Sequence, residues 1–159
     1  AGLLSHSMEA VNVVNAPVIA KNRNMNIISS KREKAGDYIT DVNLTVETER
    51  RTRNVIGTLY GNQPRIVEVM NTRIEAELGP NMLFITNEDK PGFIGSLGSI
   101  LSDAKINIAT FHLCRTKIGG DAIALIEIDE AVSSQLIEKL NNIPQVKSVK
   151  PLNFAKSII

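Results

Sequence analysis

The stretch NEDKPGFIGSLGSILSDAKINIATFHLCR at residues 87–115 decides the fold, because it joins a turn, a helix and a strand without interruption. The sequence DKPG at 89–92 is made of turn formers and predicts that a helix opens after it. Apolar residues then recur every three or four positions, as on one face of a helix: Phe93, Leu97, Ile100, Leu101 and Ala104. Small residues lie between them, and they predict close packing of this helix on a sheet: Gly95, Ser96, Gly98 and Ser99.

The residues on either side of this stretch supply three more strands and a second helix. The apolar run MLFIT at 82–86 predicts a strand before the helix, and a second strand runs from Ile106 to Arg115. A turn at Gly119 and Gly120 leads to a third strand at 122–129, and a helix carrying Leu136, Ile137 and Leu140 ends at Asn141, Asn142 and Pro144. With VKSVKPL at 146–152 as the last strand, the order is β-α-β-β-α-β, which predicts a ferredoxin-like domain.

The first half of the chain has a different organisation. Leu4, Met8, Val11 and Val14 follow helical spacing, and Pro17 predicts a kink near Asn15 and Ala16 followed by a second short helix. From Tyr38 to Leu78 the apolar residues alternate, which predicts four antiparallel strands in a meander. Gly79 and Pro80 mark the boundary. The chain is therefore expected to be α+β, with one domain at 1–79 and a second at 80–159.

Composition excludes several classes of protein. Eighteen Lys and Arg against seventeen Asp and Glu give a net charge of +1, which argues against nucleic acid as a partner. The single cysteine, Cys114, excludes a disulfide-stapled secreted scaffold and favours the cytoplasm. No apolar run reaches the length that spans a membrane, and the start, AGLLSHSMEAVNVVN, lacks both the features of a signal peptide and an initiator Met. That start resembles the interior of a helix, which suggests a fragment of a longer protein, and proteolytic processing would give the same start.

Asp89 and the helix start form the first candidate site. A zwitterionic amino acid needs an anion for its ammonium group and oriented N–H donors for its carboxylate. Asp89 supplies the anion for the ligand's ammonium group. The N–H groups near Gly92, Phe93 and Ile94 are donors of the kind that bind anions at helix N-termini, and they suit the ligand's carboxylate. The alternative is that Asp89 only caps the helix.

The segment from Asn87 to Arg115 resembles an ACT domain, a ligand-sensing module of enzymes of amino-acid metabolism. The preceding part is similar to the allosteric substrate-binding domain of long D-3-phosphoglycerate dehydrogenases, and three sequences carry this similarity: VNVVNAP at 11–17, GTLYG at 57–61 and PRIVEV at 64–69. The combination resembles the C-terminal regulatory part of that family.

This resemblance implies a regulatory fragment that binds L-serine, forms a homo-oligomer through its ACT domain and works with catalytic domains located elsewhere in the protein. The family uses NAD, but the chain has no G-x-G-x-x-G fingerprint, so neither a cofactor nor a catalytic centre is expected in it. The family's serine site corresponds to Asn87, Asp89 and Asn107, all of which are polar here. Family members often carry His or Tyr where this chain has Asn87.

Two further groups of residues have weaker signals. The related domain binds an anion between basic side chains, and Arg65, with Arg73 nearby in sequence, matches that position best; the alternative is solvated surface. His112 and Cys114 lie two apart on one strand, but a metal site needs three or four ligands, so no metal is expected.

The sequence also leaves two rival hypotheses open. One is the small subunit of an iron-sulfur L-serine dehydratase, which would need cluster-binding cysteines beyond Cys114. The other is a free-standing ACT interaction module with no bound metabolite.

Overall fold

The computed structural model describes residues 10–31, 38 and 40–154, and it divides the chain into two compact units, residues 1–35 and residues 36–159. The second contains both predicted sheets, so the boundary predicted at 79 and 80 falls inside it, between strands that end at Glu77 and begin at Asn81.

In the first unit, helix α2 spans Ala16–Asn22 with a proline in its first turn, as predicted. Asn12 explains why the chain turns before it: its side-chain oxygen accepts the N–H groups of Val14 and Asn15, each at 2.9 Å. A side chain that bonds its neighbours' backbone in this way competes with helical hydrogen bonds. The prediction that Val11 and Val14 belong to a helix is therefore wrong, and Leu4 and Met8 lie outside the described residues.

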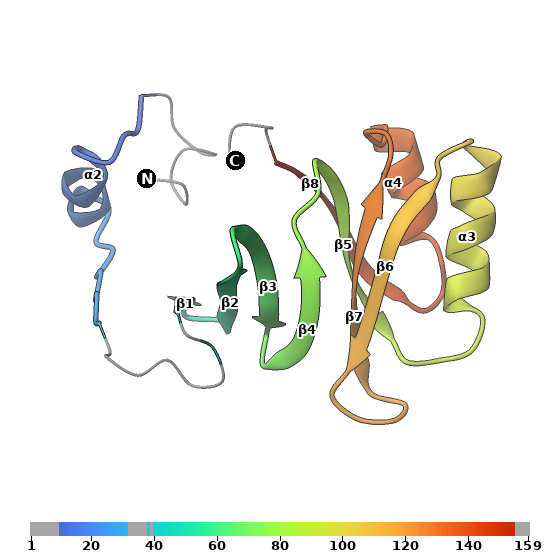
Figure 1. Cartoon of the computed structure of the whole chain (residues 1–159), viewed down its shortest axis with the longest axis horizontal. Helices are drawn as coiled ribbons and strands as arrows, with labels where there is room; N and C mark the ends of the chain where they lie inside the picture. Colours follow the sequence, from blue (N-terminus) through green and yellow to red (C-terminus); the bar gives the residue numbers. More distant parts are fainter. Residues whose placement is uncertain (1–9, 32–37, 39, 155–159) are drawn as a thin grey trace. The chain divides into compact units, whose positions relative to one another are not determined.

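The meander is confirmed. Its four strands are β1 (Asp41–Glu47), β2 (Thr52–Tyr60), β3 (Gln63–Val69) and β4 (Thr72–Glu77), and they pair in sequence order (Figure 1). The β2–β3 turn contains Gly61 at φ 62°, and the β3–β4 turn contains Met70 and Asn71 at φ 49° and 60°. Positive φ at consecutive positions suits a tight hairpin.

The ferredoxin-like order is also confirmed. The elements are β5 (Asn81–Glu88), α3 (Phe93–Asp103), β6 (Ile108–Arg115), β7 (Asp121–Ile128), α4 (Ser134–Asn141) and β8 (Val146–Asn153). The sheet order is β6-β7-β5-β8 and every neighbouring pair is antiparallel. Strands β6 and β8 are therefore its two edges.

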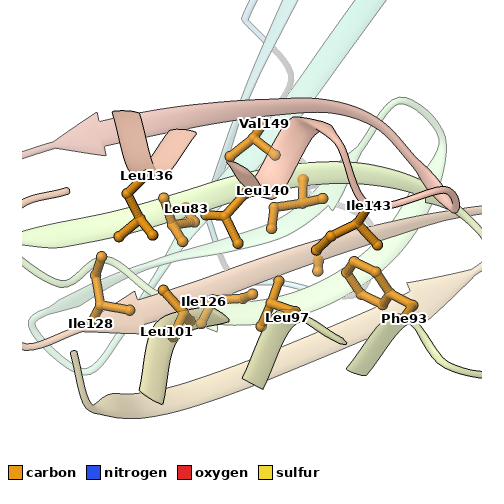
Figure 2. Packing of buried hydrophobic residues seen from close by; sticks show 12 residues of the cluster. Leu83, Phe93, Leu97, Leu101, Ile126, Ile128, Leu136, Leu140, Ile143 and Val149 are labelled. Carbon is orange, nitrogen blue, oxygen red and sulfur yellow. The ribbon is translucent and has the colours of Figure 1, made fainter. Parts of the chain in front are cut away.

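Both helices cover one face of this second sheet (Figure 1). The predicted stripe of α3 is buried there: Phe93, Leu97 and Leu101 are at most 2% exposed. They pack with Leu136 and Leu140 of α4 in one continuous apolar layer (Figure 2). On the other face, a second cluster joins the meander to this sheet and consists of Ile74, Ala76, Met82, Ile123 and Leu125.

The small residues of α3 do not pack against the sheet, contrary to the prediction from the sequence. A Cβ atom added at Gly95 or Gly98 would meet no heavy atom within 4 Å, and Ser96 and Ser99 are exposed. The slim part of the helix thus faces away from the sheet, because the large apolar residues of the stripe already occupy the buried face.

Candidate ligand-binding site

A hollow of about 430 Å³ lies where β5 passes into α3. Five of the six residues predicted for the ligand site line it: Asn87, Asp89, Gly92, Phe93 and Ile94. The end of β6 also lines the hollow through Leu113 and Arg115, and the β6–β7 connection does so through Ile118 and Gly119. The hollow therefore joins two loops that are far apart in the sequence.

Asp89 ties these loops together. Its Oδ2 accepts hydrogen bonds from Arg115 Nη1 at 2.6 Å and from the Gly119 N–H at 3.0 Å, and its own N–H donates to the Gly120 oxygen at 2.8 Å. The hydrogen bond from Gly119, together with that from Arg115, lowers the pKa of the Asp89 carboxyl. Asp89 is therefore an anion at neutral pH.

The geometry excludes the capping role for Asp89. The N-cap of α3 is Gly92, which has no side chain, and both hydrogen bonds to the Asp89 carboxylate come from outside the helix. The alternative prediction that Asp89 only caps this helix is therefore wrong. Since both bonds end on Oδ2, Oδ1 makes no hydrogen bond with any residue that the structure describes.

Asn87 carries an unsatisfied acceptor at the hollow. The residue is 1% exposed, and its Nδ2 donates to the Glu88 oxygen at 2.9 Å. Its Oδ1 is buried and has no hydrogen-bond partner among the described residues. Because buried polar atoms are rarely left unpaired in native proteins, this oxygen is suited to accept a hydrogen bond from a ligand.

The start of α3 provides donors beside these acceptors. Gly92 has φ 96°, a left-handed conformation that favours glycine, and the helix runs from Phe93. The N–H groups of the first helical turn have no partner within the helix and carry its positive end. Ile94 and Ile118 are 57% and 85% exposed and form an apolar rim.

Asn107, the sixth predicted residue, lies at the opposite end of the sheet. Arg115 and Asn87 both pair with Ala122, whereas Ile108, which follows Asn107, pairs with Ile128. The length of β6 places Asn107 roughly 25 Å from the hollow. Its amide donates to Asp129 Oδ2 at 3.0 Å. One chain therefore does not bring Asn107 and Asp89 together.

The two arginines of the predicted anion site lie apart on the meander. Arg65 forms an ion pair with Glu77, and its guanidinium lies 5.1 Å from the centre of the Tyr60 ring. Arg65 is opposite Glu77 in β4, and Arg73 lies four positions earlier in that strand, so the two are separated by about 13 Å. An anion site at this position stays a prediction.

The pair His112 and Cys114 is part of a packed strand. Cys114 packs against the apolar cluster between the meander and the second sheet, and burial raises the pKa of its thiol. Within the described residues no group of three or more His, Cys, Asp or Glu side chains could hold a metal ion. Among the helices described, none is long and apolar enough to cross a membrane.

The sequence patterns did not identify Arg115 and the Gly119–Gly120 turn as parts of the site. The available signal was topological. In the order β6-β7-β5-β8, the end of β6 and the end of β5 flank the same end of β7, so Arg115 had to lie near Asp89.

This fold and the polar hollow at its first turn define the chain as an ACT-domain protein, and the ACT domain model matches residues 81–145. The model of the D-3-phosphoglycerate dehydrogenase intervening domain matches residues 1–70. Through these two domains the chain belongs to the D-3-phosphoglycerate dehydrogenase family, of which it corresponds to the regulatory part.

Proteins similar to this chain are named D-3-phosphoglycerate dehydrogenase. The chain is 36% identical over 156 residues to the D-3-phosphoglycerate dehydrogenase of Methanocaldococcus jannaschii, an alignment that covers 96% of this chain and 29% of that protein. The enzyme of Bacillus subtilis is 32% identical over 145 residues, with coverages of 91% and 28%. That of Synechocystis is 31% identical over 148 residues, with coverages of 92% and 27%. The chain thus spans less than a third of the length of these relatives.

Proposed function

We propose that this chain binds L-serine in the hollow between β5 and α3, and that binding regulates a D-3-phosphoglycerate dehydrogenase. The catalytic domains and NAD belong to other parts of that enzyme, which oxidises 3-phosphoglycerate in L-serine biosynthesis. The observation that carries the proposal is that an anionic Asp89 and an unsatisfied Asn87 oxygen line the same hollow beside the start of α3.

The chemistry of the hollow suits a small amino acid. The ammonium group needs acceptors, and both Asn87 Oδ1 and Asp89 Oδ1 are without hydrogen bonds among the described residues. The carboxylate needs donors, which the first turn of α3 supplies.

Asn107 enters the proposal through a second copy of the chain. In an antiparallel pairing of β6 with β6 of that copy, Asn107 of the second copy lies next to the Arg115 end, and hence next to Asp89. Edge β6 suits such a pairing, because the other edge, β8, carries Pro151 and exposed Lys147 and Lys150, which discourage strand addition. L-Serine is then bound between two ACT domains.

A ligand held by two subunits favours the arrangement in which both contact it. That difference in affinity between arrangements is the means by which a bound ligand shifts a conformational equilibrium, and couplings of about 1–3 kcal/mol are typical. Regulation of the catalytic domains follows from this shift.

Calorimetry with L-serine tests the proposal, with glycine and 3-phosphoglycerate as comparisons. Asp89→Ala and Asn107→Ala should each weaken L-serine binding by roughly ten- to hundredfold, because a lost hydrogen bond to a charged group costs about 1.5–3 kcal/mol. Asp103→Ala, which changes an exposed carboxylate at the far end of α3, is the matched control and should leave binding unchanged. Equal heats for the wild type and both site variants, or no L-serine binding by the wild type, would refute the assignment.

A further inference from the structure

Within the hollow, one cation is placed to bind the carboxylate of a ligand. The lining residues include two basic side chains, Lys90 and Arg115. Lys90 Nζ is engaged with Glu88 Oε2 at 2.5 Å, and its side chain is 62% exposed. Arg115 contacts Asp89, the residue proposed to bind the ammonium group, at 2.6 Å.

We propose that Arg115 binds the carboxylate of the amino-acid ligand by exchanging its partner, Asp89, for the ligand. This inference rests on the function proposed above and adds to it the residue that selects for an α-carboxylate. Without ligand, the Arg115 guanidinium and the Asp89 carboxylate neutralise each other. With ligand, the ammonium pairs with Asp89 and the carboxylate pairs with Arg115, so every charge keeps an opposite partner.

The supports of Asp89 make this exchange feasible. The Gly119 N–H holds Oδ2 at 3.0 Å, and the Asp89 N–H is held by the Gly120 oxygen, so the carboxylate stays in place when Arg115 turns away. Asp89 is the more buried residue of the pair, because its side chain is 20% exposed and that of Arg115 is 50% exposed. A long, half-exposed side chain can turn to a ligand with little rearrangement of its surroundings.

Ligand chemistry gives a second reason. The ammonium and carboxylate of an amino acid are attached to the same carbon, so a ligand whose ammonium reaches Asp89 places its carboxylate close to the same group. Left against Asp89 alone, the two carboxylates would repel each other. A guanidinium beside Asp89 removes this repulsion, and its planar fork binds a carboxylate through two parallel hydrogen bonds.

The test compares L-serine with L-serinamide at about pH 6.5, where the α-amino groups of both are protonated. L-Serinamide then keeps the ammonium and hydroxyl groups but has a neutral amide in place of the carboxylate. Calorimetry on the 159-residue chain should show that the wild type binds L-serine at least about tenfold more tightly than L-serinamide. Arg115→Gln should weaken L-serine binding by roughly ten- to hundredfold and leave L-serinamide binding unchanged or stronger, since Asp89 is then free of its internal partner. Arg115→Lys, which keeps the charge but not the fork, should retain part of the preference.

Lys90→Gln is the matched control, because it removes the other cation of the hollow without touching Asp89, and the serine-to-serinamide ratio should not change. If Arg115 only positions Asp89, Arg115→Gln will weaken both ligands by the same factor, and the inference is overturned. Loss of the preference in Lys90→Gln would overturn it as well. Should the wild type bind neither ligand, the proposed function fails first, which distinguishes that outcome from a failure of Arg115 alone. Melting curves of Arg115→Gln and Arg115→Lys verify that both variants are folded.

Discussion

At the scale of single residues, Asp89 has a structural role in addition to the ligand-binding role proposed for it. Its carboxylate joins the β5–α3 turn to the β6–β7 loop through Gly119 and Arg115. The same hydrogen bonds keep it ionised, and this is the state that an ammonium group requires. A single carboxylate therefore both shapes the hollow and supplies its negative charge.

The lowered pKa of Asp89 has a consequence for stability as a function of pH. A carboxyl whose folded-state pKa is depressed stabilises the fold above its unfolded-state pKa, about 3.9 for Asp, and this contribution disappears as pH falls through the folded-state pKa. We expect the wild type to melt at a higher temperature than Asp89→Asn from pH 7 down to about 5, and the difference to shrink below about pH 4.

Thermal melts across this pH series, followed by circular dichroism, measure the difference. Asp103→Asn controls for the loss of one negative charge on the same segment. A constant difference between wild type and Asp89→Asn down to pH 3 would show that ionisation of Asp89, and with it the hydrogen bonds from Gly119 and Arg115 to the charged carboxylate, adds nothing to the stability of the fold.

Single residues of the site were predictable where their chemistry was local. Asn87, Asp89 and the start of α3 follow one another in sequence, so turn chemistry and helix ends were enough to place them together. Arg115 and Gly119 enter the site through strand pairing, 26 and 30 positions after Asp89. Local patterns do not contain that information.

At the scale of elements, α3 is the part of the fold most directly determined by its sequence. Its apolar stripe is buried as the spacing predicted, and it begins directly after the predicted turn. The orientation of its small residues was not predictable, because composition alone does not say whether a glycine allows close packing or faces solvent. The α2 region shows the same limit: the competing hydrogen bonds of Asn12 ended a periodicity that looked helical.

Two glycines of this segment should respond in opposite ways to the same change. Gly92→Ala places a Cβ atom on a backbone with φ 96°, which L-residues avoid, and the added atom meets only Gln145 Nε2 at 3.4 Å. We therefore expect backbone strain alone to lower the free energy of unfolding by about 1–2 kcal/mol. Gly98 lies inside the helix, and a Cβ atom added there meets no heavy atom within 4 Å. Gly98→Ala should therefore raise the free energy of unfolding by about 0.5–1 kcal/mol.

Urea unfolding of the two variants beside the wild type compares these effects directly. Equal destabilisation by both changes would mean that space around α3, rather than the left-handed turn at Gly92, limits substitution.

At the scale of the unit formed by residues 36–159, the two sheets share one apolar cluster. Ile74 and Ala76 of β4 are 1% and 0% exposed and pack with Met82, Ile123 and Leu125 on the face that the helices leave free. The alternation in β4 predicted that this strand had an apolar side, but the partner of that side was not in the pattern. Contacts between sheets depend on tertiary packing, which a period of two does not specify.

The second sheet has unequal edges, and the proposed pairing of two copies follows from this inequality. Strand β8 carries Pro151, which cannot donate a hydrogen bond, as well as exposed lysines, whereas β6 has neither a proline nor a charged residue before Arg115. A strand edge without such protection pairs readily with another strand. We expect the chain to be a dimer without ligand at concentrations of roughly tens of micromolar, a range accessible to sedimentation.

Ala109→Lys should shift this dimer toward monomer. Ala109 is exposed, and the register between β6 and β7 shifts at this position, so a lysine there leaves the β6–β7 ladder intact while placing a positive charge on the edge. In a symmetric pair the bulky charged side chain occurs on both copies, so it opposes strand pairing at two places. Asn153→Lys puts the same side chain on the β8 edge and should leave the dimer unchanged. Sedimentation equilibrium of the wild type and the two variants decides between the edges. A monomeric wild type contradicts the pairing. A dimer that is weakened by Asn153→Lys but not by Ala109→Lys assigns the pairing to β8, and in that case Asn107 of the second copy lies away from Asp89 and the hollow binds its ligand within one chain.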